Sequence, residues 1–350
     1  MLVTSPILDF ELDDAHEAHE PPEARGLRRD GVRLLVSSGD ADPVHARFAH
    51  LGAFLAPGDL VVANTSATYP AALDGRLPDG EPVVVHLSGA QPDGSWLVEV
   101  RAPAAGATAP LHLGTALDID LFPGGRIRLL TPFADSQRLW RAHLDMPGTP
   151  LGYAARFGRP IRYRHVTRDW PIGFYQSIFS AAPGSAEMPS AARPVTARVL
   201  ADLTRRGVAI TTLRLDTGVS SLEGGESPYP EHYEVSARTA ATVNATRAEG
   251  GRVVALGTTV VRALATVTEP DGTVHAGDGW TERVVSADAP VPSVQGLLTG
   301  WHEPEASHLM MLEAITGRSV LERAYRAALD AGYLWHEFGD SHLLLTGGAR

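Results

Sequence analysis

Residues 250–262, with the sequence GGRVVALGTTVVR, constrain the fold more than any other stretch of the chain. Residues 252–256 form a short apolar run rich in β-branched side chains, which is typical of a strand buried on both faces of a parallel sheet. Gly257 breaks this run, and Thr258 and Thr259 are residue types that favour the start of a helix. We therefore predict a buried strand, a tight turn and a helix in direct succession.

The turn before this helix is a candidate site for an anionic group. A helix N-terminus leaves backbone N–H groups unpaired, and the helix dipole favours negative charge there, so a ligand carboxylate would suit the position. Arg262 lies in the first turns and opposes the dipole, so we expect it to have a carboxylate partner from the protein or from a ligand. The alternative is an ordinary strand–helix unit with a threonine cap and a solvated arginine.

The composition limits what the chain can do. Its 350 residues, of which 44% are hydrophobic, leave room for two domains and a substantial core. The absence of cysteine excludes disulfides, thiolate nucleophiles and cysteine-ligated zinc. A net charge of −11 argues against broad, sequence-independent binding of nucleic acid, although a local basic patch could still hold RNA. No apolar run approaches the length of a membrane span and the N-terminal region is acidic, so we expect a cytoplasmic protein without membrane contact.

Changes in composition and in the pattern of predicted strands and helices divide the chain into three parts. Residues 1–26 are polar and rich in proline and glutamate, as in a flexible tether. Residues 27–68 and 151–350 alternate strand and helix patterns, which predicts an α/β domain with a mostly parallel sheet and flanking helices. Between them, residues 69–150 consist of strand-like runs separated by Pro-Asp-Gly and Pro-Gly-Gly turns, which is typical of an inserted all-β barrel.

Local patterns predict the individual elements of the α/β domain. Besides the strand at residues 252–256, strands are predicted at residues 33–37, 60–63, 208–215, 333–338 and 342–345. Helices are predicted at residues 45–55, 196–206, 236–249, 305–316, and from a capping box of Ser319 and Glu322 to Gly332.

Residues 156–168 combine cations with stacking surfaces. The segment carries Arg156, Arg159, Arg162, Arg164 and Arg168, interleaved with Phe157, Tyr163 and His165. Proteins use this mixture on single-stranded RNA. A solvated hairpin at the domain junction explains the pattern equally well.

Motifs in the second half of the chain are similar in order and spacing to those of a known family. They are GGRVVALGTTVVR, Gly279-Trp280-Thr281-Glu282, Trp301-His302-Glu303-Pro304, Leu309-Met310-Met311-Leu312 and Phe338-Gly339-Asp340. In these motifs the chain resembles the S-adenosylmethionine:tRNA ribosyltransferase-isomerase family of queuosine biosynthesis, and weaker similarities extend the likeness to residues 28–345. The resemblance implies an α/β domain interrupted by a β-barrel.

The resemblance also implies a reaction. Members of that family use S-adenosylmethionine as a substrate, without a metal, and transfer its ribosyl part to an aminomethyl-deazaguanine in a tRNA anticodon. This chain departs from the family pattern, because Ala67 and Ala72 stand where the family has arginines, and Pro194 and Arg214 stand where it has histidines. Residues of those types move protons and hold anions, so their replacement indicates a changed reaction or a changed acceptor within the same fold.

Three functions are consistent with these observations. We favour an S-adenosylmethionine-dependent enzyme that cleaves a C–S bond, with tRNA as the acceptor implied by the resemblance. The alternative is an enzyme of specialised metabolism that acts on S-adenosylmethionine without tRNA. It would eliminate or cyclise the aminobutyryl arm and release methylthioadenosine, or transfer a group to a small acceptor. A third reading is a non-catalytic binding protein. The sequence leaves the acceptor, the product and the oligomeric state open.

The candidate catalytic residues are His302, Asp216 and Asp340. His302 precedes a predicted helix N-terminus, where the dipole disfavours imidazolium and keeps the ring able to accept a proton; the alternative is a loop histidine bonded to backbone. Asp216 could act as a base, or it could pair with Arg214. Asp340 could orient His302 or bind a ribose hydroxyl, or it could simply shape its turn.

The candidates for binding S-adenosylmethionine are Gly257, Thr258, Thr259, Arg262, Tyr175, Gln176, Glu231, Glu234, Trp301 and Arg214. Glu231 and Glu234 match a Glu-x-x-Glu spacing of the family. One of them could face Arg262 or hold the α-amino group of the ligand, unless both belong to a solvated helix cap. Tyr175 could stack on adenine and Gln176 could bind its edge, although aromatic residues more often pack in the core.

Overall fold

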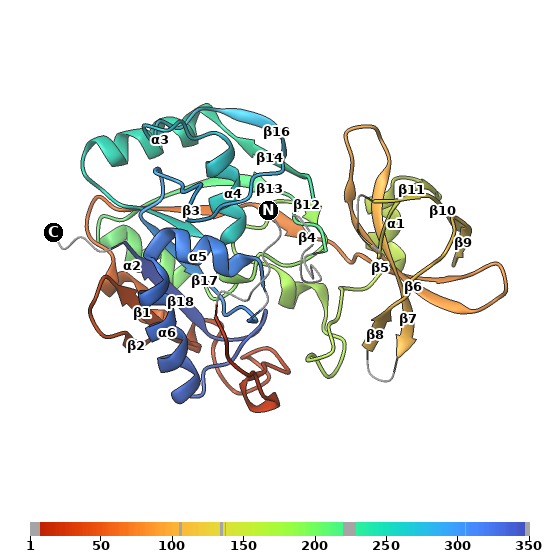
Figure 1. The fold of residues 1–350 in the computed structure, drawn as a ribbon, viewed down its shortest axis with the longest axis horizontal. Helices are drawn as coiled ribbons and strands as arrows, with labels where there is room; N and C mark the ends of the chain where they lie inside the picture. The colour runs from red at the N-terminus through yellow and green to blue at the C-terminus, as the bar shows by residue number, and fades with distance from the viewer. Residues whose placement is uncertain are drawn as a thin grey trace.

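The computed structural model describes residues 8–104, 107–133, 136, 138–219, 229–304 and 306–346. Within these ranges the chain forms an α/β unit and a β-barrel, which lie on the left and the right of Figure 1. The barrel strands follow the third strand of the α/β unit in sequence, so the barrel is an insertion. The predicted class, α/β with an inserted all-β barrel, is confirmed.

Nine strands form the large sheet, in the order β16-β14-β13-β3-β15-β17-β18-β1-β2. Their bounds are β1 Arg33–Ser38, β2 Val44–Arg47, β3 Leu60–Asn64, β13 Ala209–Leu215, β14 Glu231–Val235, β15 Val253–Leu256, β16 Gly277–Thr281, β17 Gly296–Thr299 and β18 Ser341–Leu345. The central strands β13, β3, β15 and β17 pair in parallel. Every residue of β3, β15 and β17 is buried, as expected for strands covered on both faces.

The sheet is more mixed than the sequence pattern predicted. Strands β14, β16 and β2 pair antiparallel with their neighbours, and β17 and β18 are also antiparallel. Strands β1 and β2 follow one another in sequence without an intervening helix, and such a short connection joins antiparallel strands.

Helices cover both faces of the sheet. Four of them pack on one face: α3 Ala237–Ala248, α4 Thr258–Thr266, α5 His308–Thr316 and α6 Arg318–Asp330. The opposite face is covered by α2 Ala197–Arg205 and the 3-10 helix Phe48–Phe54. Fully buried leucines such as Leu264 and Leu321 anchor the first layer, and each contributes roughly 1.5–3 kcal/mol through burial. Thr196 and Ser236 cap α2 and α3 with their side chains, and both helices lie where the sequence pattern predicted them.

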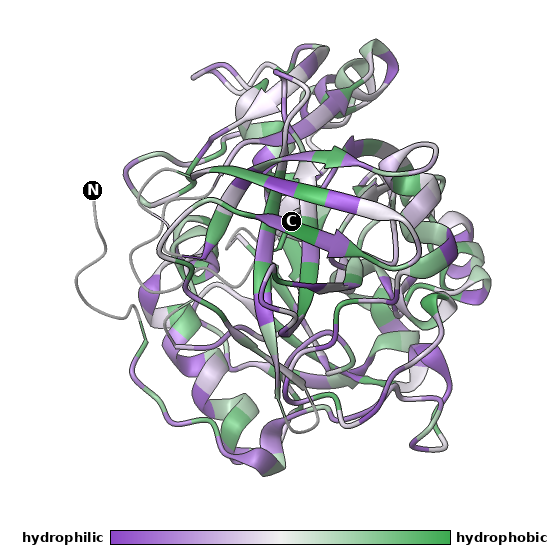
Figure 2. Ribbon diagram, turned by 90° about the vertical axis from the view of Figure 1, so that its right-hand side faces the viewer, coloured by the Kyte–Doolittle hydropathy of each residue, from purple (hydrophilic) through white to green (hydrophobic). Residues whose placement is uncertain are grey.

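The inserted strands close into a barrel because β11 pairs with both β10 and β7. The strands are β5 Ala72–Arg76, β6 Pro82–Ala90, β7 Trp96–Ala104, β9 Asp118–Leu121, β10 Gly125–Pro132 and β11 Leu139–Asp145, with β8 Ala107–Pro110 paired at the side of β7. Hydrophilic and hydrophobic residues alternate along the barrel strands, which face the viewer in Figure 2. The inward residues form a separate core that includes Val85, Leu97 and Ile127.

Two short elements lie where the barrel meets the α/β unit. Helix α1 Pro150–Phe157 packs Tyr153 and Ala154 against the barrel core. Strands β4 Ser66–Thr68 and β12 Ala182–Ser185 form a parallel pair. The chain therefore leaves the central strand β3 through β4 before it enters the barrel.

Three local predictions were wrong. Residues 45–55 form part of β2 and a 3-10 helix instead of one α-helix, because β2 pairs with β1 and the buried Phe48 and Leu51 have the three-residue spacing of a 3-10 turn. Residues 333–338 form no strand, because Trp335 pairs with Glu17 in a single isolated bridge that is not extended into a ladder. Helix α6 begins after Gly317, so Ser319 lies inside the helix and caps nothing.

From Leu8 onward the N-terminal segment is fastened to the rest of the chain at several points, while other side chains of it, such as Asp14, are exposed. Leu8 and Ala18 are buried, at 5% and 1% exposure. The His16 ring bonds to the carbonyl of Leu329 (3.2 Å), and the Arg25 guanidinium donates to the carbonyl of Phe338 (2.7 Å). Residues 1–7 lie outside the described ranges. Across the part of the chain that the structure describes, no helix has the length and apolar character needed to cross a membrane.

Candidate active site

A cavity of about 780 Å³ opens where the central parallel strands end. Residues within two positions of the ends of β13, β15 and β17 line it: Thr217, Gly257 and Gly300. The carboxyl edge of parallel strands is the usual position of ligand sites in α/β proteins. The barrel contributes Arg101 and Thr108 to the same wall.

The predicted strand–turn–helix unit forms one side of this cavity. Gly257 connects β15 to α4 with a φ of +103°, a conformation that favours glycine. Helix α4 has no side-chain cap, and Thr258 and Thr259 line the cavity at its first turn. Asn64 at the end of β3 donates to the Thr259 hydroxyl (3.4 Å), which ties the turn to the sheet. The first turn of α4 thus lies on the cavity wall, and the N–H groups of Thr258 and Thr259 have no hydrogen-bond partner among the described residues.

Arg262 has the carboxylate partner that was predicted for it, and this partner is Glu231. The two side chains are in direct contact and only 12% and 8% exposed, and both line the cavity. Glu231 also accepts a hydrogen bond from the N–H of Gly218 (3.0 Å). Burial raises the pKa of Glu231, and the charge of Arg262 opposes this shift. Glu234 is instead exposed on β14, opposite Arg214, and does not line the cavity.

His302 lies on the cavity wall and is held from three sides. Its Nε2 atom shares a hydrogen bond with the Thr299 hydroxyl (2.9 Å), and its carbonyl accepts from the Trp335 indole (3.1 Å). Its N–H donates to the Tyr325 hydroxyl (3.3 Å). Burial lowers the pKa of His302 well below its ordinary value, so the ring is neutral near neutral pH. This state suits a proton acceptor.

A second histidine stacks on His302. The ring of His308, the first residue of α5, lies 4.8 Å from the His302 ring at an interplanar angle of 27°. Burial and the charge of Arg262 lower the pKa of His308 to about 4. The sequence prediction missed this residue, although a polar side chain at the start of the apolar segment Leu309-Met310-Met311-Leu312 was a usable signal.

Aromatic side chains form further parts of the wall. Tyr175 lines the cavity, is 4% exposed and packs on Phe338 at 5.2 Å between ring centroids. Trp301 also lines it and stacks on His342 at 4.6 Å and 9°. The Trp301 indole N–H is buried without a hydrogen-bond partner among the described residues. Gln176 lies outside the wall, because both ends of its amide bond to the backbone of Thr68 (3.1 and 2.7 Å).

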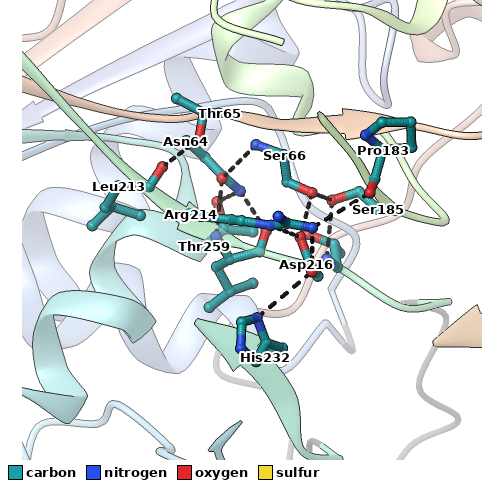
Figure 3. A network of polar contacts seen from close by, with 12 residues as sticks. Asn64, Thr65, Ser66, Pro183, Ser185, Leu213, Arg214, Asp216, His232 and Thr259 are labelled. Carbon is teal, nitrogen blue, oxygen red and sulfur yellow. Dashed lines mark hydrogen bonds and ion pairs between the residues drawn. The ribbon is translucent and has the colours of Figure 1, made fainter. Parts of the chain in front are cut away.

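Arg214 and Asp216 pair with each other, which was the alternative stated for them. Arg214 donates to both carboxylate oxygens of Asp216, at 2.7 and 2.9 Å. The Ser66 hydroxyl also donates to Asp216 (2.7 Å), and Ser185 donates to Ser66 (2.8 Å), as Figure 3 shows. Neither Arg214 nor Asp216 lines the cavity. The Asp216 carboxylate is therefore already occupied as a hydrogen-bond acceptor.

Asp340 has a structural set of partners. Its carboxylate accepts from the backbone and side chain of Arg33 (2.7 and 2.8 Å) and from the N–H of Leu334 (2.9 Å). It shares neither a hydrogen bond nor the cavity wall with His302 in the described part of the chain. These contacts match the second interpretation of Asp340 given above, in which the residue shapes its turn.

The arginine-rich segment begins in the last turn of α1, with Arg156 and Phe157, and continues as a loop, not as a hairpin. Two of its arginines are paired, Arg159 with Asp74 (2.8 Å) and Arg162 with Asp169 (3.2 Å). Arg164 lines the cavity, and Arg168 lies over the Trp170 ring. The segment thus contributes less free positive charge than its composition suggested.

The other end of the cavity has a second cluster that the sequence prediction missed. His165 bonds to Glu337 (2.7 Å) and stacks on His336, whose ring centroid is 3.8 Å away. Among the described residues, Asp14, Glu17 and His19 place possible metal-ligand atoms within 4.8 Å of one another, and of these Glu17 lines the cavity.

Comparisons with known proteins place this architecture in a family. The family model described as queuosine biosynthesis protein matches residues 7–344. A Moorella thermoacetica protein named S-adenosylmethionine:tRNA ribosyltransferase-isomerase is 33% identical over 358 residues, covering 96% of this chain and 98% of that protein. A protein of the same name from Anaeromyxobacter sp. (strain Fw109-5) is 35% identical, covering 96% and 97%.

A solved structure shows the same fold. The crystal structure of S-adenosylmethionine tRNA ribosyltransferase from Thermotoga maritima aligns with a TM-score of 0.53 and 23% identity, covering 97% of this chain and all of that one (100%). Fold and cavity together define an α/β protein with an inserted barrel and a ligand-sized cavity at the carboxyl ends of its central strands. The chain belongs to the queuosine biosynthesis protein family, which confirms the resemblance found in its motifs.

Proposed function

We propose that this chain is an enzyme that binds S-adenosylmethionine in the cavity and cleaves one of its C–S bonds. The observation that carries the proposal is the placement of the α4 N-terminus, Arg262 and His302 on one wall. Relatives along the whole chain are named for a reaction of S-adenosylmethionine with tRNA, which supports the choice of substrate.

The charges of the wall fit the methionyl part of this substrate. The free N–H groups at the start of α4 and the Arg262 guanidinium favour a carboxylate. Glu231, held beside Arg262, favours the α-amino group. Tyr175 and Trp301 offer apolar surface for adenine.

A sulfonium acidifies the protons on its attached carbons, and C–S cleavage therefore needs a base in a dry site. The cavity wall supplies two stacked imidazoles for this role, His302 and His308, and burial keeps both neutral near neutral pH. We propose no metal for this reaction.

The acceptor has two candidates. The names of the relatives favour tRNA. The second candidate is a reaction without RNA, and the pairing of the surface arginines favours it. On the barrel, Arg126 bonds to Asp120 (3.0 Å) and Arg141 bonds to Asp93 (2.7 Å), in addition to the paired arginines of residues 156–168. Cations that already face carboxylates release few counterions on binding a phosphate backbone, so they add little affinity.

Incubation of the protein with S-adenosylmethionine, with and without tRNA that carries the aminomethyl-deazaguanine, separates the candidates. Release of adenine and methionine that depends on the tRNA supports the ribosyl transfer. Release of methylthioadenosine without RNA supports the second candidate. If calorimetry detects binding of S-adenosylmethionine but neither product set forms, the enzyme assignment is wrong and a binding protein remains.

A further inference from the structure

We infer that His308 is the group that exchanges a proton with the bound substrate, and that His302 is the residue that positions it. This inference rests on the proposed function and assigns its acid–base step to a residue absent from the motifs that suggested it. It follows from how differently the two stacked rings are bonded.

The His302 ring is already used by the protein. Its Nε2 atom is bonded to Thr299, and the backbone on either side of the ring is fixed by Tyr325 and Trp335. By contrast, neither nitrogen of the His308 ring has a hydrogen-bond partner among the described residues, although the ring lines the cavity. A half-buried imidazole with free nitrogen atoms beside a ligand-sized space is available to a ligand.

The surroundings keep this imidazole neutral before the substrate arrives. His302 stacks on one face of the His308 ring, and the Arg262 guanidinium on α4 is the charged group that acts on it. His342 on β18 and His336 in the loop before it act on His302 and disfavour a charge there as well. Two rings in contact and facing a cation hold at most one added proton between them, so His308 starts as a proton acceptor.

The proton step can be written without any further reagent. The C–H bond of a carbon attached to the sulfonium breaks, its electron pair stays on that carbon, and the proton forms an N–H bond with a free nitrogen of His308. His308 becomes an imidazolium, next to the neutral His302 ring. The electron pair on that carbon then forms a C=C bond to the neighbouring carbon, from which a leaving group departs with its own bonding pair. The imidazolium gives its proton to this departing group, which restores the neutral ring. When the C–S bond breaks, its electron pair goes to sulfur, which leaves as a neutral thioether.

The test compares His308→Gln with wild type and with two further variants. Glutamine retains a polar side chain but does not take a proton near neutral pH. His302→Gln tests the positioning role, and His275→Gln makes the same change at an exposed histidine outside the cavity. For each protein we would measure S-adenosylmethionine binding by calorimetry, turnover as a function of pH, and exchange of the protons beside the sulfonium into D2O by NMR.

We expect His308→Gln to bind S-adenosylmethionine within about threefold of wild type and to lose both proton exchange and turnover by about 10²–10⁴-fold. The acidic limb of the pH profile should disappear with it, whereas His302→Gln should keep that limb at a lower rate. His275→Gln should match wild type. Undiminished exchange and turnover in His308→Gln would overturn this inference alone. Failure of the wild type to bind S-adenosylmethionine would overturn both this inference and the proposed function.

Discussion

The Arg262 guanidinium contacts the Glu231 carboxylate at the cavity wall, and the two side chains are only 12% and 8% exposed. Arg262 comes from α4 and Glu231 from β14, so the pair joins the helix to the antiparallel side of the sheet. Each member also bonds to backbone: Arg262 to the carbonyl of Thr281 (3.3 Å) and Glu231 to the N–H of Gly218 (3.0 Å). The contact therefore serves both the fold and the cavity.

Loss of Arg262 should damage stability and binding together. In Arg262→Ala the Glu231 carboxylate stays buried without its cation, and we expect the free energy of unfolding to fall by about 3–5 kcal/mol. The affinity for S-adenosylmethionine should drop by more than about tenfold, because a charge-assisted contact is lost. Urea unfolding and calorimetry measure the two effects. Arg238→Ala, a change at an exposed arginine of α3, should alter neither, and the double variant Glu231→Gln with Arg262→Met should recover part of the stability.

Replacing Gly257 should strain the turn without a steric clash. A Cβ there would meet its nearest neighbours, Ala191 Cβ and Thr259 Oγ1, at 3.6 Å, which is ordinary contact. The cost of Gly257→Ala comes instead from the φ of +103°, and we expect a loss of about 1–3 kcal/mol in thermal or urea unfolding. Gly173→Ala is the control, because its Cβ would enter open space and its φ is not in the positive region. Equal stability of the two variants would contradict this explanation.

Acid should destabilise the protein through its buried histidines. Burial lowers the pKa of His342 to about 3, and it lowers the pKa of His308 and His336 to about 4, from the ordinary 6.5. The folded state therefore binds fewer protons than the unfolded state below pH 6.5. The stability present above that pH is lost as the pH falls, by about 1.4 kcal/mol per pH unit for each such histidine.

A variant isolates one contribution to this acid loss. His16 and His19 have raised pKa values and stabilise the folded state as the pH falls. The overall pH dependence of the unfolding free energy therefore does not identify the contribution of any one histidine. In His342→Gln the decrease in unfolding free energy between pH 7 and pH 5 should be smaller than in wild type by about 2 kcal/mol. An unchanged pH dependence would mean that His342 is not a buried neutral group.

Asp216 should behave as a structural residue. Its carboxylate accepts from Arg214 and Ser66, and Figure 3 shows it enclosed by these donors. We expect Asp216→Asn to reduce the unfolding free energy by about 1–2 kcal/mol, because the pair is only partly buried, and to leave turnover of S-adenosylmethionine within about threefold. A drop of about 100-fold in turnover at unchanged stability would show that Asp216 is the base that the sequence suggested.

The sequence predicted the parts of the fold that depend on local pattern. The run at residues 252–256, Gly257 and the two threonines have one compatible arrangement, and the structure has it. The sequence prediction failed where pairing between distant segments determines the secondary structure. Residues 45–55 have a helical pattern, but the first residues of this segment belong to β2, which pairs with β1. The N-terminal residues look polar, yet hydrogen bonds from the side chains of His16 and Arg25 to backbone carbonyls more than 300 positions away hold them in place.

The candidate active-site residues could likewise be predicted only where a local motif contains them. The wall residues near a recognisable turn, such as Arg262 and His302, could be proposed from sequence because each lies within a local motif. The local pattern gave only a weak signal for His308 and none for the pair of His165 and Glu337, because only the fold shows which titratable groups lie beside them. Asp340 lies in a motif as well, but its partner Arg33 comes from the other end of the chain, and that partner decides its role.

The position of β18 in the large sheet has a consequence for synthesis of the protein. This strand, Ser341–Leu345, lies between β17 and β1. During translation β1 emerges early, but its inner edge has no neighbour until residues more than 300 positions later have left the ribosome. The barrel, whose strands are contiguous in sequence, can close long before that. Half-made chains therefore carry a finished barrel and an open sheet edge, which makes them targets for chaperones or for aggregation.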